Sequence, residues 1–432
     1  MVVGGGLAGL FTASELTARD IDVVVLEESP VAGGVARTIE KDGFALEPAV
    51  GSFSLPHPHL TPLLDRAGVA TAVAVQASIR YVYAEGRLVA IPGSPKALLV
   101  PVLGIKSKLR VLFEPLVPAC RTDDDESLAE FFRRRLGEQA GGLVSWLMAT
   151  GVYAGDPGRL SVGAAFPALA ELERTHGSVI KGAIRRRRAR PSNQAGTRVH
   201  VPEGDVSGLI DAIGGQLGDR FYPGFAVRSL RREGQTWIVE GPERITADAA
   251  VLAIGPNAAA DLVDGELGAA LAECVAAPTA VVFLGGRGPS PLPDGFGALV
   301  GPGEGWSTRG VLFESAYAPS RAPEGCWLAK VIVGGVTAPS VVDRDDERLI
   351  PEVVSEVEAI FGVRLVPDVI EVVRHRPGIP QYEVGHRRWL AGVERLLAAE
   401  PGLHLTGWGY RGVGIANLAT DAVRVADAVT RS

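Results

Sequence analysis

Three glycines near the start of the chain have the spacing of a phosphate-binding turn. Gly4, Gly6 and Gly9 follow a short apolar run and precede a segment with helical periodicity that extends to about Ala18. Glycine permits the turn at the first position, close approach of a pyrophosphate at the second, and packing of helix on strand at the third. The amides at the start of the helix would bind the phosphates. The motif predicts a dinucleotide site with contacts from Gly4, Gly5, Gly6, Leu7, Ala8 and Gly9.

Acidic residues stand where such a site needs one. Asp22 to Leu26 reads as the next strand, and Glu27 and Glu28 follow it directly. A carboxylate at that strand end accepts hydrogen bonds from ribose hydroxyls and disfavours a 2'-phosphate. The alternative is a glycine turn that only lets a helix pack on a strand. The strand, the helix and the acidic residue together favour the dinucleotide site.

The elements that position these residues occur at both ends of the chain. Met1 to Val3, the helix and Asp22 to Leu26 form a βαβ unit. The apolar run from Ala249 to Ile254 predicts a buried parallel strand. Leu403 to Gly407 reads as a further strand, and an amphipathic helix from about Ile415 to Val429 follows it after a turn.

The middle of the chain has a different character. Residues 60–200 are mainly helical in pattern, most clearly at 125–135 and 142–150, which predicts an inserted lobe. Apolar runs between about residues 280 and 338 are separated by Gly and Pro and predict the strands of a second sheet.

Composition limits the class of protein. The apolar fraction of 47% and the charged fraction of 22% are typical of a globular protein. A net charge of -7 argues against a nucleic-acid groove. Cys120, Cys274 and Cys326 are far apart, so we expect no disulfide, no metal site and a reducing cytoplasm. We expect no export signal and no membrane span, while contact with the inner face of the cell membrane stays open.

A second group of motifs resembles the amine oxidase-like flavoprotein superfamily. Gly33, Gly34, Arg37 and Thr38 follow the second strand, and GFALEPAVGSF (43–53) comes next, with Ala49 where the superfamily has a glycine. The closing text LHLTGWGYRGVGIANLATDAVRVADAV resembles the superfamily's last flavin motif. The resemblance implies FAD, and we expect it to be non-covalent because no cysteine lies near that motif. The further contacts that it implies are Gly34, Val35, Arg37, Ala49, Val50, Gly51, Ser52, Val227, Gly407, Val413, Gly414 and Ile415.

Between the two ends the chain is similar to protoporphyrinogen and coproporphyrinogen oxidases over nearly its whole length. The phrases that carry the similarity include IRYVYAEGRLVAIPGSP (79–95), DESLAEFFRRRLG (125–137), FESAYAPSRAPEG (313–325) and PGIPQYEVGH (377–386). The family implies that Arg80 binds a propionate of the tetrapyrrole, and a guanidinium suits bidentate carboxylate binding. The other substrate contacts that it implies are Gly297, Leu299 and Ala318.

We therefore expect a mixed α/β and α+β protein in which a Rossmann-type FAD-binding domain is interleaved with a substrate-binding domain and a helical lobe. The expected boundaries are 1–60, 200–265 and 385–432 for the FAD domain, 61–90 and 266–384 for the substrate domain with a mixed or antiparallel sheet, and 91–199 for the lobe. The short first strand suggests that the true start lies upstream.

The expected reaction is oxidation of a porphyrinogen by FAD and dioxygen in haem biosynthesis, with hydrogen peroxide as by-product. No general base can be assigned, and the sequence does not choose between protoporphyrinogen and coproporphyrinogen or between monomer and homodimer. Alternatives are a flavin amine oxidase or carotene desaturase-like enzyme, and an FAD-binding protein without turnover. His57 and His59 read as a turn, and the basic run Arg185 to Arg188, with Lys181 and Arg190 nearby, as a solvated loop.

Overall fold

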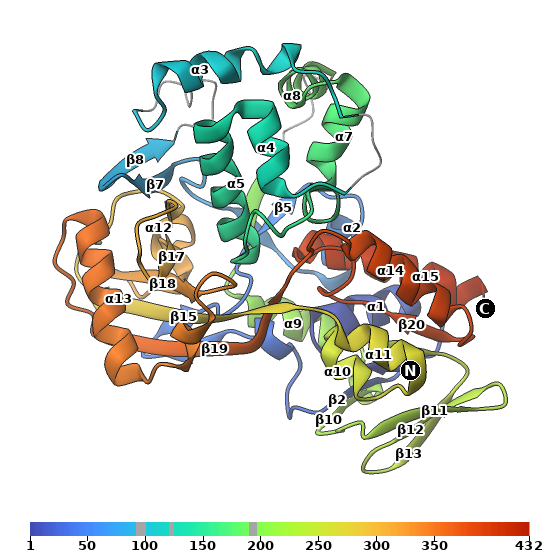
Figure 1. The fold of residues 1–432 in the computed structure, drawn as a ribbon. Helices are drawn as coiled ribbons and strands as arrows, with labels where there is room; N and C mark the ends of the chain where they lie inside the picture. Colours follow the sequence, from blue (N-terminus) through green and yellow to red (C-terminus); the bar gives the residue numbers. More distant parts are fainter. Residues whose placement is uncertain (92–100, 121–124, 190–196, 432) are drawn as a thin grey trace.

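The computed structural model describes residues 1–91, 101–120, 125–189 and 197–431. Three parts can be followed in Figure 1: a parallel sheet with both chain ends, a larger sheet beside it, and a group of helices at the top of the view. Arg190 and residues 92–95 of the porphyrinogen oxidase-like phrase lie outside the described residues.

Five parallel strands form the sheet that carries the glycine turn. Their order is β10-β2-β1-β14-β20, with bounds Phe221–Pro223, Val25–Glu27, Val2–Val3, Ala250–Leu252 and Leu403–Leu405. The strand β1 pairs with β2 on one side and with the much later β14 on the other, so the strand order reverses at β1. Open parallel sheets bind ligands outside the carboxyl ends of strands at such a point. The predicted βαβ unit and buried strand are confirmed, whereas β10 was not predicted.

Alternate side chains of these strands enter two separate cores. Val2 and Val251 pack against α1 (Leu7–Thr17), α9 (Val206–Gly215) and α15 (Ile415–Arg431), together with α2 (Leu60–Ala67). Val3 and Leu252 face the opposite side. There the cover consists of α10 (Pro256–Ala260), α11 (Gly265–Ala272), α14 (His386–Leu397) and a small antiparallel sheet of β11 (Ser229–Glu233), β12 (Thr236–Glu240) and β13 (Arg244–Ala247). The parallel sheet is thus buried on both faces, which explains its apolar strands.

The second sheet has seven strands in the order β19-β15-β18-β17-β16-β7-β8. Neighbours are antiparallel except β16 and β7, so the expected mixed sheet is confirmed. The strands are β7 (Arg80–Ala84), β8 (Arg87–Ile91), β15 (Ala276–Arg287), β16 (Gly297–Val300), β17 (Thr308–Leu312), β18 (Cys326–Gly334) and β19 (Val369–Pro380).

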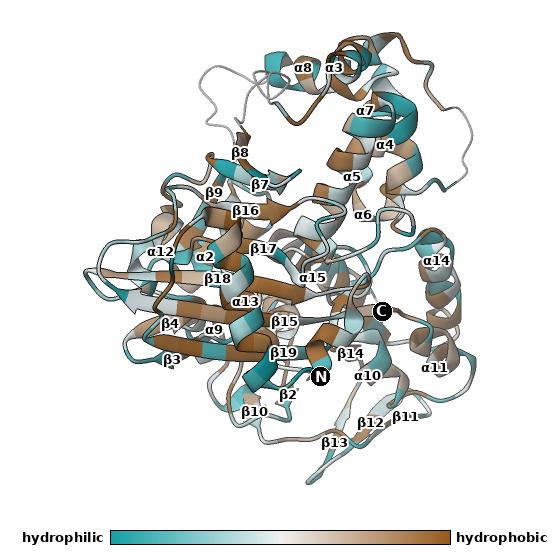
Figure 2. Cartoon of the chain, turned by 60° about the vertical axis from the view of Figure 1, so that its left-hand side comes forward, coloured by the Kyte–Doolittle hydropathy of each residue, from teal (hydrophilic) through white to brown (hydrophobic). Residues whose placement is uncertain are grey.

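Side chains of this sheet also alternate between its faces. Val282 and Val331 pack under α13 (Asp346–Phe361), whereas Phe283 and Leu328 pack against β4 (Phe44–Leu46) of the hairpin that β3 (Ile39–Lys41) completes. The brown strands β15 and β18 in Figure 2 are buried from both sides. A third small sheet contains β5 (Phe53–Leu55), β9 (Arg198–Pro202) and β6 (Thr71–Val73).

Helices occupy part of the region that the sequence predicted to be mainly helical. It contains α3 (Ile105–Leu112), α4 (Leu128–Leu136), α5 (Glu138–Tyr153), α6 (Val162–Ala165), α7 (Pro167–His176) and α8 (Val179–Ala189), with the short turn η3 (Glu114–Leu116). After α2, residues 71–91 of this region instead contribute β6, β7 and β8 to the sheets. β6 pairs with the distant β9, whereas β7 and β8 form a local hairpin that is extended by the distant β16.

The prediction that Arg185 to Arg188 form a loop was wrong, because the run lies in α8 with all four side chains exposed. Arginine has a high helix propensity, and an exposed helix end tolerates a run of one charge. His57 and His59 do form the predicted turn, in which Nδ1 of His57 accepts from the amides of His59 and Leu60 at the start of α2.

Candidate flavin and substrate site

The glycine turn connects β1 to α1 with no room for side chains at two of its positions. A Cβ on Gly9 would lie 1.8 Å from the carbonyl oxygen of Gly4, and one on Gly4 would lie 2.7 Å from Cγ2 of Ile254. Gly4 also has a φ of +103°, which favours glycine. Both positions therefore need glycine for the close packing of β1, α1 and the end of β14.

Gly6 is different because the space beside it is open. A Cβ there would meet only the carbonyl oxygen of Gly33, at 4.0 Å. Gly6 is the N-cap of α1, which has no side-chain cap and no acidic residue in its first turn. A helix start with free amides and a positive dipole end binds phosphate oxygens. The open space in front of α1 fits the pyrophosphate of a dinucleotide, and a side chain at residue 6 would fill it.

Glu27 lies at the predicted end of β2 and turns toward this loop. Its Oε2 accepts from the Gly5 amide at 2.5 Å, and its Oε1 accepts from the Ser29 amide at 2.9 Å. Each oxygen retains lone-pair capacity for a ribose hydroxyl. Glu28 points to solvent. Val227 follows a segment that hydrogen-bonds to this strand end, since the Phe225 amide donates to the Glu27 carbonyl at 2.7 Å.

The second glycine pair lies directly against the first turn. The Gly33 amide donates to the Gly5 carbonyl at 2.9 Å, and a Cβ on Gly34 would be 3.5 Å from the Gly6 Cα. Gly34 has a φ of +54°, and Val35 beside it is exposed. Arg37 forms an ion pair with Asp211 of α9 at 2.9 Å. The structure thus brings the two predicted glycine motifs together.

Residues 47–51, defined here as the clamped segment, are held by buried side chains of the second sheet and its loops. Nζ of Lys330 donates to the carbonyls of Glu47 and Ala49 at 2.6 and 2.7 Å. The Arg321 guanidinium donates to the Gly51 carbonyl, and Nε2 of His375 contacts the Pro48 carbonyl at 3.1 Å. Val50 and Ser52 complete this predicted flavin-contacting stretch, and both are half-buried.

Glu47 anchors the start of the clamped segment and also caps α9. Its Oε1 accepts from the Val206 amide at 3.0 Å, and its Oε2 accepts from the Thr38 hydroxyl at 3.1 Å. Glu47 has no exposed surface. Burial raises the pKa of this carboxyl to about 7, although Arg321 acts in the opposite direction.

The C-terminal loop, residues 407–414, returns to the glycine turn. The hydroxyl of Tyr382 donates to the Trp408 carbonyl at 2.6 Å and accepts from the Gly412 amide at 2.5 Å. The ring of Tyr382 stacks on His386 with centroids 4.1 Å apart, and His386 contacts the Tyr410 carbonyl at 3.0 Å. The motif PQYEVGH is therefore a brace for this loop.

Predicted contacts from the different motifs meet in one core. Leu7 and Ala8 of α1, Ile415 of α15 and the partly buried Val50 pack in the same apolar cluster. Gly407 lies near the carbonyl of Ile254, beyond the end of β14, and Gly414 ends the loop just before α15. Val413 instead packs against the core of the helical lobe.

Arg80 begins β7 and lies beside two of the other predicted substrate residues. It pairs in register with Gly297, and Leu299 pairs with Val82 in the same ladder. Arg80 is exposed, and its guanidinium lies 5.4 Å from the centre of the Phe296 ring. An arginine held over an aromatic face can still receive a carboxylate through its donor edge.

Ala318 does not present a surface at this place. It is 1% exposed and packs with Ala74, Val201 and Tyr317. Its neighbour Tyr317 lies 4.5 Å from Phe296, ring centre to ring centre, so Ala318 supports the aromatic pair from behind.

Several contributing residues were missed in the sequence. Phe296 directly precedes the predicted Gly297, and an aromatic residue at a strand start was an available signal. Lys330 stands alone in the apolar run 327–333, and a single charge in a buried strand was a second signal. Tyr382 gave no signal of its own, because its partners are 26 and 30 residues away along the chain.

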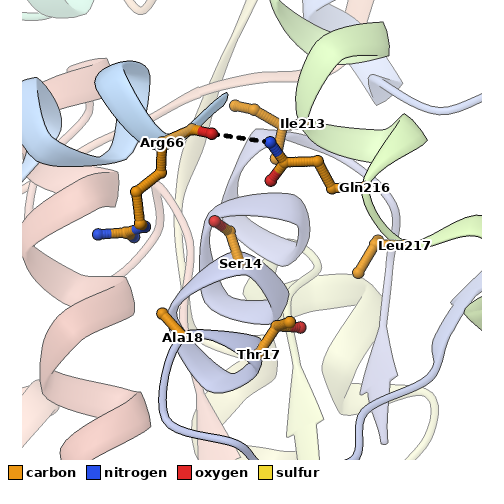
Figure 3. Close-up of a pocket in the computed structure, with 7 residues that line it drawn as sticks. All are labelled: Ser14, Thr17, Ala18, Arg66, Ile213, Gln216 and Leu217. Carbon is orange, nitrogen blue, oxygen red and sulfur yellow. Dashed lines mark hydrogen bonds between the residues drawn. The ribbon is translucent and has the colours of Figure 1, made fainter. Parts of the chain in front are cut away.

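Other features add no chemistry to this site. Within the described residues there is no group of three or more His, Cys, Asp or Glu side chains suited to a metal, and no helix long and apolar enough to cross a membrane. A cavity of about 290 Å³ lies between the end of α1, α2 and α9, as Figure 3 shows. At the edge of this cavity the side-chain amide of Gln216 donates to the Arg66 carbonyl at 2.9 Å. The glycine turns do not line this cavity.

The fold and the two glycine motifs define a flavin-binding oxidoreductase. The model of the family described as flavin containing amine oxidoreductase matches residues 7–430, and the chain belongs to this family. Its cofactor is FAD. The open space at Gly6 and the carboxylate of Glu27 fit a dinucleotide of this kind. This confirms the cofactor and the superfamily that the motifs predicted.

Individual relatives are similar over nearly the whole chain. Coproporphyrinogen III oxidase of Bacillus subtilis is 28% identical over 464 residues, covering 100% of this chain and 97% of the relative. The chloroplastic protoporphyrinogen oxidase of Nicotiana tabacum is 28% identical, covering 100% and 85%. A crystal structure from Exiguobacterium sp. 255-15, provisionally named protoporphyrinogen oxidase, superposes with a TM-score of 0.85 at 25% identity, covering 99% and 97%.

Proposed function

We propose that the protein oxidises a porphyrinogen, either protoporphyrinogen IX or coproporphyrinogen III, with dioxygen as acceptor and hydrogen peroxide as by-product. The observation that carries the proposal is the exposed Arg80 over Phe296 on the strand pair β7–β16. A guanidinium beside an aromatic plane suits a flat macrocycle with carboxylate arms. The names of the relatives agree with this substrate class.

The residues of the chain would bind and orient the substrate. Arg80 holds a propionate, while Phe296 and the half-buried Leu299 offer apolar surface to the macrocycle. When bound, FAD supplies two-electron oxidation of a carbon and delivery of the electrons to dioxygen. Arg80 then contributes mainly to substrate binding, because a guanidinium forms charge-assisted hydrogen bonds to a carboxylate.

We further propose that FAD and the substrate are bound by different parts of the chain. Residues 1–60, 200–265 and 385–432 hold FAD, residues 61–90 and 266–384 hold the substrate, and the range 91–199, of which residues 101–120 and 125–189 are described, contains the helical lobe. The lobe contacts the substrate strands directly, since Nε1 of Trp146 donates to the Val300 carbonyl at 3.0 Å.

The experiment is a fluorescence assay in air with each porphyrinogen offered separately to the FAD-loaded protein. We expect porphyrin fluorescence to grow faster than in a blank without enzyme. Arg80→Ala should raise KM about tenfold, by loss of a charge-assisted hydrogen bond, without loss of FAD. Arg87→Ala, an exposed arginine on the paired strand, is the control. No fluorescence growth from protein that holds FAD would refute the proposal, and turnover of an amine would replace it.

We also propose that the outer end of the lobe rests on an anionic membrane surface. Ile105, Leu112, Phe113 and Leu116 are 56–78% exposed. In Figures 1 and 2 the helices α3 and α8 lie together at this end, and α8 carries Arg185 to Arg188. Exposed apolar side chains near clustered arginines suit anionic lipid. Cosedimentation with phosphatidylglycerol vesicles but not with phosphatidylcholine vesicles would support this, and Leu112→Glu should abolish it.

A further inference from the structure

The buried side of the clamped segment is unusually rich in charge. Glu47, Glu314, Arg321 and Lys330 are each at most 3% exposed. They come from four separate parts of the chain: the clamped segment itself, α12 (Glu314–Tyr317), η5 (Pro319–Arg321) and β18. Buried charges are expensive unless they are paired and hydrogen-bonded, so a cluster of four calls for an explanation.

Lys330 is bound to backbone in this cluster, with two carbonyls as its hydrogen-bond acceptors. It lies on the face of β18 that turns away from α13, next to Leu328 on that face, with Nζ 6.0 Å from the Phe283 ring centre. Its Nζ donates to the carbonyls of Glu47 and Ala49 and not to a carboxylate. Arg321, in contrast, pairs with Glu314 and also donates to the Tyr317 hydroxyl at 2.7 Å.

The bonds of this cluster constrain one short stretch of backbone. Lys330, His375 and Arg321 occupy the carbonyls of residues 47, 48, 49 and 51 from the side of the second sheet. In a trans peptide the N–H points away from the C=O, so the amides of these held peptide planes face the other side. Val50, between the held carbonyls, packs toward the core that contains the start of α1 and of α15.

We propose that Lys330 is a positioning residue that holds residues 47–51 in the conformation that meets the flavin and places a buried positive charge behind that segment. The inference rests on the proposed flavin contact of Ala49, Val50 and Gly51. A positive charge near a flavin stabilises its reduced, anionic form, so Lys330 raises the tendency of bound FAD to be reduced. Burial lowers the pKa of Lys330 and the charge of Arg321 acts in the same direction, while Glu314 and Glu47 raise it.

The test uses purified protein loaded with FAD and two readouts other than turnover, the FAD dissociation constant and the flavin midpoint potential. Lys330→Met should weaken FAD binding by tenfold or more and lower the midpoint potential. Lys330→Arg, which keeps the charge and the donors, should stay near the wild type. Lys41→Met is the matched control, because Lys41 also donates to a carbonyl, that of Ile370, but its other partner is Glu371 and not the clamped segment.

Folded Lys330→Met protein with the wild-type potential and FAD affinity would overturn the inference while leaving the proposed function intact. If Lys330→Met does not fold, Lys330→Arg is compared with Lys330→Gln, which keeps a donor but not the charge. A lower potential in the Gln variant supports the inference, and equal potentials refute it. Wild-type protein that takes up no FAD would refute the proposed function, and this inference with it.

Discussion

Glu47 shows how one side chain can impose a pH dependence on the whole protein. Its pKa rises from 4.5 to about 7 in the folded state because the carboxyl is buried. The folded state therefore holds a proton that the unfolded state has released, and stability falls as the pH rises from about 4.5 to 7. Arg321 and the Val206 amide reduce this effect, and Glu314 adds to it.

Replacing Glu47 with Gln should remove this dependence. The amide can accept from Val206 and donate to the Thr38 hydroxyl, so the contacts survive without a titratable group. We expect the free energy of unfolding of the wild type, relative to Glu47→Gln, to fall by on the order of 3 kcal/mol between pH 4.5 and pH 7. Urea unfolding of both proteins across this range measures the difference, and parallel pH profiles would contradict the assignment.

At the scale of elements, the contact between β1 and α1 depends on Gly9. A methyl group there would lie 1.8 Å from the Gly4 carbonyl oxygen, so the helix must move away from the strand. Gly9→Ala should therefore give protein with little or no bound FAD, visible as loss of the flavin absorption bands. Gly142→Ala in α5 is the control, since its Cβ would meet no heavy atom within 4 Å. A yellow Gly9→Ala protein would show that the turn tolerates this movement.

The brace from Tyr382 to the C-terminal loop provides a second test at this scale. Burial raises the pKa of Tyr382, so its hydroxyl stays protonated and can donate to Trp408. Tyr382→Phe keeps the ring stack on His386 but leaves the Trp408 carbonyl and the Gly412 amide without this partner. We expect about tenfold weaker FAD binding by titration.

The control for this test is Tyr153→Phe, another buried tyrosine. It loses one hydrogen bond, to the Ala165 carbonyl, and leaves the bonds of Tyr382 to Trp408 and Gly412 unchanged. Equal FAD affinity in Tyr382→Phe and Tyr153→Phe would mean that the brace does not position the loop.

At the scale of the whole molecule, the helical lobe has its own buried ion pair. Arg135 and Glu114 have no exposed side-chain surface, and Glu114 also accepts from the Ser178 hydroxyl and the Val179 amide. This pair joins α4, η3 and the start of α8. Removal of one partner leaves an uncompensated buried charge.

Arg135→Met should destabilise the lobe by about 3–5 kcal/mol without removing FAD, because the flavin motifs lie on other elements. Limited proteolysis should then cut within residues 101–189 while the flavin spectrum persists. Arg133→Ala, which removes an exposed pair with Glu138, is the control. Simultaneous loss of FAD and lobe structure would show that the two parts unfold as one unit.

The sequence by itself determined the elements whose physics is local. The roles of Gly4, Gly6 and Gly9 could be predicted because a side chain at each position would clash with a neighbouring residue or with a bound phosphate. The strands at 250–252 and 403–405 were predicted from their apolar residues, and the final helix was predicted from a single apolar stripe. The cofactor followed from these motifs together with the resemblance of both chain ends to flavoproteins.

Only the tertiary structure decided what depends on distant pairing. β7 forms a local hairpin with β8 and also pairs with β16, more than 200 residues later, and this second pairing placed Arg80 beside Gly297 and Phe296. Lys330 holds carbonyls 281 and 283 residues away, and Tyr382 joins two points of a loop that local patterns describe only as a turn. Periodicity indicates which face of an element is buried, but it does not indicate which polar group from a distant part of the chain that face contacts.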